Sequence, residues 1–249
     1  MPAGMEIYND SGVLYASAEM ISHFCRKSGT GTTVANTAGG SAASMAQVAI
    51  PAGFDNPIVA ISCGSTMAYS GLFGGNAYFW CSGAVGTAYT YYIFDTPGDL
   101  TTAHQGMELY DTASKIVFSS NQYPMQILGL NPGVTNYAGK TIAAGLPAWG
   151  NTELNSGLQC WDTGVAVPWT DPETSGPCAD IQYHHTVNAK GAFIDNGGSR
   201  INPANILYES VQISAGNDSS YTEPPSAINR GAVVFAVDVT HIPVGSTFF

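Results

Sequence analysis

Charge is scarce in this chain, and long apolar runs are absent. Only 10% of the 249 residues are Asp, Glu, Lys or Arg, whereas soluble domains carry about a quarter. Large uncharged surface is often covered by partners, so the scarcity favours assembly; a sparse, Ser/Thr-rich surface is the alternative. Apolar runs such as "PIVAIS" and "GAVVFAVDV" are of strand length, far from the roughly 20 residues of a membrane span. We therefore expect no membrane insertion.

Positive charge and paired cysteines are also lacking. Seven Lys and Arg against 18 Asp and Glu give a net charge of −11, which repels a phosphate backbone, so nucleic acid is not an expected ligand. Five cysteines without CxxC spacing argue against a disulfide scaffold or zinc knuckle. Cys160 and Cys178 bracket a Trp/Pro-rich loop and could come close, but buried free thiols are the more common state. The start "MPAGMEIYND" lacks a basic and apolar leader, so we expect cytoplasmic synthesis without a signal peptide.

Turn residues and strand formers dominate instead. The chain has 29 Gly and 14 Pro, and 45% of it is hydrophobic. Strand-like pieces such as "MAQVAIP", "PIVAISCG", "AYFWCSG" and "TAYTYYIFD" follow one another at short intervals. The small, polar run "KSGTGTTVANTAGGSAAS" is expected to form a mobile or edge loop, and no helix of ten residues is predicted. This spacing predicts an all-β, sandwich-like fold.

One motif occurs twice. The stretch "GMEIYNDSGVLYASAEM", Gly4 to Met20, is followed by "GMELYDTASKIVFSSNQY", Gly106 to Tyr123. The first strands align at an offset of 102, and "VLYAS" aligns with "IVFSS" at 103, which places a one-residue slip in the turn. Each copy predicts a β-hairpin, and because a hairpin is not stable alone, each is expected to open a larger sheet.

The repeat predicts two tandem β-sandwich-like units, residues 1–100 and 101–249. Each closes on an apolar run that meets an aspartate, Asp95 in "YYIFDTPGDL" and Asp238 in "RGAVVFAVDVTHIP". The second unit holds a loop-like, Trp/Pro-rich insertion at about 145–180. Aromatic faces beside amides and acids can bind sugars, or the tryptophans can pin the loop to the core or to a partner subunit. The candidate receptor or partner contacts are Trp149, Trp161, Trp169, Asn151, Asn155 and Asp171.

Motifs for catalysis and cofactors are not found. Gly139-Lys140-Thr141 resembles the end of a P-loop, but Val134 stands where the motif needs its first glycine. His184 and His185 are adjacent, so on a strand they point to opposite faces and cannot grip one metal together. No GxSxG elbow is present. We expect neither a cofactor nor a metal, and no enzymatic activity; a polysaccharide-degrading enzyme is the least favoured alternative.

The residues from Gly4 to Leu14, and the run from Tyr91 to Gly129, resemble a family of tail proteins of long-tailed bacteriophages encoded beside the large host-specificity protein. In that family a glycine, an alternating strand, a turn and a return strand precede a segment like "PMQILG". The second copy fits this segment at residues 124–129, whereas "ISHFCRKSG" in the first copy fits it poorly. The resemblance covers about a third of the chain.

This resemblance implies a structural protein of the tail tip, baseplate or fibre of the virion, with no catalytic residue to transfer. Its implied partners are other phage tail proteins, including the host-specificity or central tip protein. Because three-fold symmetry is usual where a tail narrows, we expect a homotrimer or three copies around a central protein. The alternative is a receptor-binding module that recognises a host glycan or pilus through the Trp-rich insertion.

Overall fold

The computed structural model describes the backbone of residues 6–8, 14–17, 23–37, 42–96, 107–110, 116–120, 122–146, 158–170, 177–215, 227–229 and 233–248. Side chains are described over the same ranges except residues 6–8, 14–17, 158–170, 177–188, 207–215 and 227–229. Across these ranges the regular elements are strands, apart from a 3-10 turn at Asn196–Gly198. The all-β prediction is confirmed.

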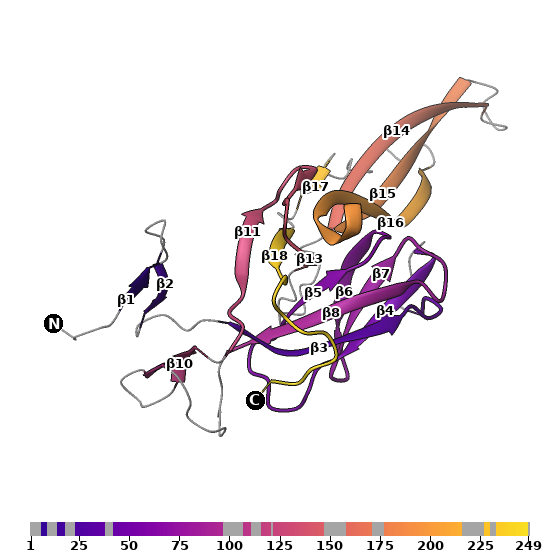
Figure 1. The fold of residues 1–249 in the computed structure, drawn as a ribbon. Helices are drawn as coiled ribbons and strands as arrows, with labels where there is room; N and C mark the ends of the chain where they lie inside the picture. The colour runs from indigo at the N-terminus through magenta and orange to yellow at the C-terminus, as the bar shows by residue number, and fades with distance from the viewer. Residues whose placement is uncertain are drawn as a thin grey trace.

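One sheet has six antiparallel strands in the order β11-β18-β13-β5-β8-β3 (Figure 1). Its central strands are apolar and nearly continuous because both faces of the sheet are covered. Its strands, in chain order, are β3 (Phe24–Thr32), β5 (Ile58–Ser62), β8 (Ala88–Asp95), β11 (Gln126–Leu130), β13 (Ile142–Gly145) and β18 (Phe235–Asp238).

The second sheet has eight strands and faces the first. Its main path runs β12-β16-β15-β6-β7-β4, and β14 adds to β15 and β17 to β14. Figure 1 shows β14 and β15 extending away from the sandwich. The strands are β4 (Ser44–Ala49), β6 (Met67–Phe73), β7 (Asn76–Cys81), β12 (Thr135–Asn136), β14 (Leu158–Thr170), β15 (Pro177–Asp195), β16 (Arg200–Ala215) and β17 (Ala227–Asn229).

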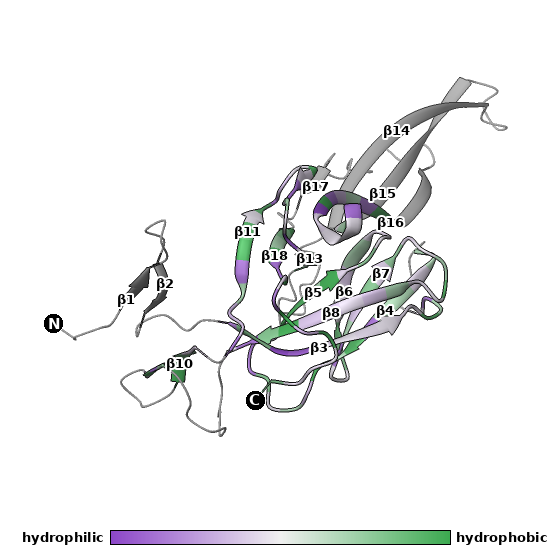
Figure 2. Ribbon diagram, viewed as in Figure 1, coloured by the Kyte–Doolittle hydropathy of each residue, from purple (hydrophilic) through white to green (hydrophobic). Residues whose placement is uncertain are grey.

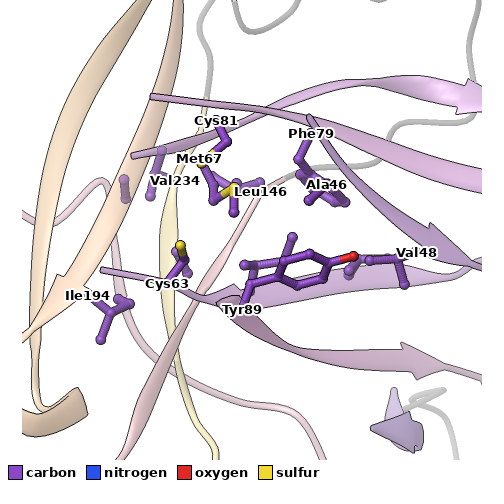
Figure 3. Close-up of a cluster of buried hydrophobic side chains, with 14 of the residues drawn as sticks. Ala46, Val48, Cys63, Met67, Phe79, Cys81, Tyr89, Leu146, Ile194 and Val234 are labelled. Carbon is purple, nitrogen blue, oxygen red and sulfur yellow. The ribbon is translucent and has the colours of Figure 1, made fainter. Parts of the chain in front are cut away.

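The main core lies between the two sheets. Ile61 and Ile93 from the six-stranded sheet pack in one buried cluster with Met67 and Phe79 from the other sheet. Figure 3 shows Met67 and Phe79 in this cluster. Tyr89 spans this core, and its hydroxyl donates a hydrogen bond to the Gln47 carbonyl 2.8 Å away. The apolar stretches of β5, β7 and β8 appear green in Figure 2. The sandwich-like prediction is therefore confirmed.

A second buried cluster covers the outer face of the six-stranded sheet. Tyr92, Phe94 and Val237 project to this side, where Val239 and Ile242 close over them. Alternate residues of β5, β8 and β18 thus reach different cores, as the period of two in a strand requires. The segment that follows β18 is held against this face.

Each predicted unit supplies three strands to the six-stranded sheet and three to the main path of the eight-stranded sheet, and the second unit also supplies β14 and β17. Residues 1–100 contribute β3-β8-β5 and β4-β7-β6, and residues 101–249 contribute β11-β18-β13 and β12-β16-β15 in the mirrored order. The two sets meet where β5 pairs with β13 and β6 with β15. The units therefore share one sandwich and one main core, because the central strands of each set complete their hydrogen bonds across the junction.

A shared β-bulge shows that the duplication continues beyond the hairpins. In β3–β8 the register passes from Cys25↔Phe94 to Lys27↔Ile93 and skips Arg26. In β11–β18 it passes from Ile127↔Val237 to Gly129↔Ala236 and skips Leu128, 102 residues after Arg26. A bulge at the same place in both edge strands makes β3 and β11 structural counterparts.

Both predicted hairpins are present. They are β1 (Glu6–Tyr8) with β2 (Leu14–Ser17), and β9 (Glu108–Tyr110) with β10 (Ile116–Ser119). Glu6 pairs with Ser17 as Glu108 pairs with Ser119, so the offset is 102 on both strands. The expected one-residue slip in the turn is wrong, because the two loops are of equal length and each return strand carries a bulge. The hairpins also touch each other through β2 and β10.

Two segments expected to be loops contain strands. The run from Lys27 is not a loop at its start, because β3 continues to Thr32 as the edge of its sheet. Within the 145–180 insertion, β14 pairs with β15 without interruption from Leu158↔Ala189 to Thr170↔Pro177. Continuous pairing satisfies the backbone groups that a loop would leave to water.

The same register separates Cys160 from Cys178. Cys178 pairs with Trp169, which lies nine residues beyond Cys160 along β14. At about 3.3 Å per residue this places the two cysteines about 30 Å apart, whereas a disulfide needs Cα atoms within about 7 Å. A bond between Cys160 and Cys178 within one chain is therefore excluded.

Candidate assembly surface

Strand β11 is an open edge of the six-stranded sheet. Its inner side pairs with β18, and no described segment pairs with its outer side. Ile127 is 46% exposed, Leu130 66%, and Val134 shortly after the strand 69%. The strand, "QILGL", contains no charge or proline. Edge strands are usually protected by such residues, by shortness or by covering segments.

The counterpart edge, on β3, is covered. The Phe248 N–H donates to the Arg26 carbonyl at 2.8 Å, and the Ser28 N–H donates to the Ser246 carbonyl at 2.9 Å. Thr247 forms an antiparallel bridge with Lys27 between these two bonds. Residues 246–248 thus add a short strand to β3, which is the arrangement called β-augmentation. Because β11 has the same register and bulge, its outer edge is suited to an extended segment too.

The start of β11 is held by the chain that follows the first hairpin. The Met125 N–H donates to the His23 carbonyl at 2.8 Å, and the Cys25 N–H donates to the Tyr123 carbonyl at 2.8 Å. The fully buried Phe24 anchors the second hairpin by packing against Leu109, Val117 and Phe118. The two copies of the repeat therefore contact and stabilise each other where the edge strands β3 and β11 begin.

A small polar cavity of about 220 Å³ lies at this end of β11. Lys140 Nζ lies 2.6 Å from Asp238 Oδ2, and Thr240 donates to Oδ1 from its N–H and its hydroxyl, at 3.0 and 2.6 Å. Burial of Asp238 opposes ionisation, but these hydrogen bonds outweigh it and hold its pKa below the ordinary value. The cavity is lined by Tyr123, Pro124, Gln126, Lys140, Asp238, His241 and Ile242.

The P-loop-like Lys140 is thus used within the fold. It lies in a turn with Gly139 at φ +75°, and its charge pairs with Asp238. The counterpart Asp95 has a similar task, because its carboxylate accepts the N–H groups of Asp55 and Asn56 at 2.9 and 2.7 Å. Both aspartates close the turn that leads into a central strand, β13 or β5. The aspartate that ends each apolar run in the sequence therefore indicates a structural turn.

The predicted receptor contacts are not brought together by the described residues. Trp161 and Trp169 lie eight residues apart on β14, a separation of about 26 Å that is too long for one sugar ring. The other predicted contacts, Trp149, Asn151, Asn155 and Asp171, lie outside the residues that the structure describes. His184 and His185 are adjacent on β15, as expected.

The described ranges contain no group of three or more His, Cys, Asp or Glu placed to hold a metal ion. They also contain no helix of the length and apolarity that a membrane span needs.

Comparison with models of protein families, with curated proteins and with solved structures found no match for this chain. The resemblance to phage tail proteins therefore stays a prediction from the residues quoted above. Sequence reasoning used "PMQILG" only as a motif of that family and missed β11 as an open edge. The uncharged, apolar residues of β11 are visible in the sequence, but only the strand order shows that this strand lies at the edge of a sheet.

Proposed function

We propose that this protein is a structural component of a bacteriophage tail tip, baseplate or fibre, and that it assembles with other tail proteins through the outer edge of β11. The observation that carries the proposal is the difference between the two duplicated edges. One is occupied by residues 246–248, and the other exposes Ile127 and Leu130. The low charge of the chain supports the same conclusion.

Assembly would proceed by strand addition. An extended segment of a neighbouring tail protein pairs with the backbone of β11, and its side chains cover Ile127, Leu130 and Val134. Burial of each such side chain contributes about 1.5–3 kcal/mol before the cost of association. We propose that the protein acts as a homotrimer or as three copies around a central tip protein.

The test compares two equally conservative surface changes. Leu130→Lys places a charge on the open edge, whereas Val85→Lys places one on a similarly exposed valine, 60% accessible, in the turn before β8. Particles of the phage that encodes the chain are labelled with gold-tagged antibody against it. We expect label at the distal end of tails with wild type and Val85→Lys, and loss of label with Leu130→Lys. Absence of the wild-type chain from purified particles would overturn the proposal.

Receptor binding is the second candidate function, favoured by one observation. The β14–β15 hairpin extends away from the sandwich and carries Trp161 and Trp169 (Figure 1). Asp162 pairs with His185. Replacing residues 163–184 by an Asn-Gly turn therefore shortens the hairpin and keeps the residue pairs between Asp162–His185 and the sandwich. Normal particles that no longer adsorb would support this function, and unchanged adsorption would reject it.

A further inference from the structure

Two cysteines from facing sheets meet at one corner of the sandwich. β5 ends at Ser62, and the chain then crosses to the other sheet, where β6 begins at Met67. Met67 pairs directly with Cys81 on β7, and the carbonyl of Cys63 accepts the Ile194 N–H of β15 at 2.7 Å. The crossing therefore places Cys63 beside the end of β7 that carries Cys81.

The corner is fixed by two hydrogen bonds between Thr66 and Ser82. The Ser82 N–H donates to the Thr66 carbonyl at 3.0 Å, and the Thr66 N–H donates to the Ser82 hydroxyl at 3.0 Å. These bonds hold the turn after Cys63 against the residue after Cys81. The relative position of the two cysteines is thus set by the fold.

The two thiols lie in the same buried cluster of the main core (Figure 3). The Cys63 thiol donates to the Ala88 carbonyl at 3.5 Å. The Ser65 N–H points at Cys63 Sγ at 3.4 Å, and the Gly83 N–H points at Cys81 Sγ at 3.3 Å. The neighbouring Cys81 side chain, followed by burial, raises the pKa of Cys63. The neighbouring Cys63 side chain and the Gly83 N–H lower the pKa of Cys81 despite its burial.

We propose that Cys63 and Cys81 are a redox pair that closes into a disulfide between the two sheets when the protein meets a peroxide. The thiolate of Cys81 attacks one oxygen of hydrogen peroxide, the O–O bond breaks, and hydroxide leaves. The Cys63 sulfur then attacks the resulting sulfenic sulfur, and the hydroxyl departs with a proton as water. Two thiols are oxidised by two electrons, and one peroxide is reduced to two waters.

The bond would close a loop around the β6–β7 hairpin and join the sheets covalently. Cross-linking restricts the unfolded chain, so the oxidised protein should unfold at a higher temperature than the reduced protein. A thiol reductant reverses the change. The inference does not depend on the proposed function, because it concerns the core and not the β11 edge.

The chain supplies its own control in Cys25. That thiol is buried in the other cluster, donates to the Lys27 carbonyl at 3.6 Å, and has its pKa raised by burial to about 12. The full-length protein is treated with hydrogen peroxide, alkylated under denaturing conditions, digested and analysed by mass spectrometry. We expect a linked peptide pair containing Cys63 and Cys81, and an unchanged result with Cys25→Ser.

The same oxidation should raise the thermal midpoint of wild type and Cys25→Ser, and dithiothreitol should restore it. Cys63→Ser and Cys81→Ser should show no such rise. The wild-type peptide map decides the question even where these variants fold poorly. Recovery of both cysteines as alkylated thiols, or of Cys81 as a sulfinic acid without the linked pair, would overturn the proposal.

Discussion

Gly191→Ala should separate the two halves of the shared sandwich. Gly191 precedes the residue of β15 that pairs with Met67 of β6. A Cβ atom at Gly191 would lie 2.0 Å from the Met67 carbonyl oxygen and 2.7 Å from its carbonyl carbon. Backbone cannot rotate away as a side chain can, so β6 and β15 must move apart by more than about 1 Å. Overpacking of a core costs about 1–3 kcal/mol, and the lost β6–β15 contact adds to it.

The assay is urea unfolding followed by fluorescence, with free energies from linear extrapolation. We expect Gly191→Ala to lose about 2 kcal/mol or more of unfolding free energy. Gly133→Ala is the matched control, since no atom lies within 4 Å of its added Cβ and its φ is not in the left-handed region. That variant should stay within about 0.5 kcal/mol of wild type. Equal stability of Gly191→Ala and wild type would refute the close junction of β6 and β15.

Three further substitutions test contacts that hold the second hairpin and two turns against the sandwich. Phe24→Ala empties a fully buried site against Phe118, so it should cost about 3–5 kcal/mol and speed hydrogen exchange in β9 and β10, measured by mass spectrometry. Asp95→Ala leaves two turn N–H groups without their acceptor and should cost about 1–3 kcal/mol in urea unfolding. Because the pKa of Asp238 is depressed in the fold, its contribution is present above the unfolded value of about 3.9 and is lost as pH falls through the folded value. Lys140→Met should therefore lose up to about 1 kcal/mol at neutral pH, and its stability should converge with wild type as pH falls below the folded pKa of Asp238.

Much of the local structure follows from the sequence. The hairpins could be predicted because strand alternation and turn residues are properties of neighbouring positions. Strands β4, β5, β7 and β8 coincide with the apolar pieces that turn residues separate. Asp95 and Asp238 marked the ends of equivalent strands, because each accepts hydrogen bonds at a turn that the fold uses twice.

The arrangement of these strands could not be predicted from the sequence. The pairing of β5 with β13 joins residues more than 80 positions apart, and no local pattern specifies such a partner. The equivalence of β3 and β11 is also hidden, because "FCRKS" and "QILGL" share a bulge but not their residues. A bulge is set by the register with β8 or β18, which sequence similarity between the edge strands does not report.

The duplication itself explains why one edge has no partner strand among the described residues. Two equivalent half-sandwiches joined at their central strands must place equivalent strands, β3 and β11, at the two ends of the same sheet. Residues 246–248 lie on β3 and therefore cannot also lie on β11. The side chains have diverged accordingly: β3 carries Arg26 and Lys27 beside its covering strand, whereas β11 presents Ile127 and Leu130 to the surface. An edge with these residues gains free energy when a partner strand covers it, and this is the physical basis for the proposed assembly surface at β11.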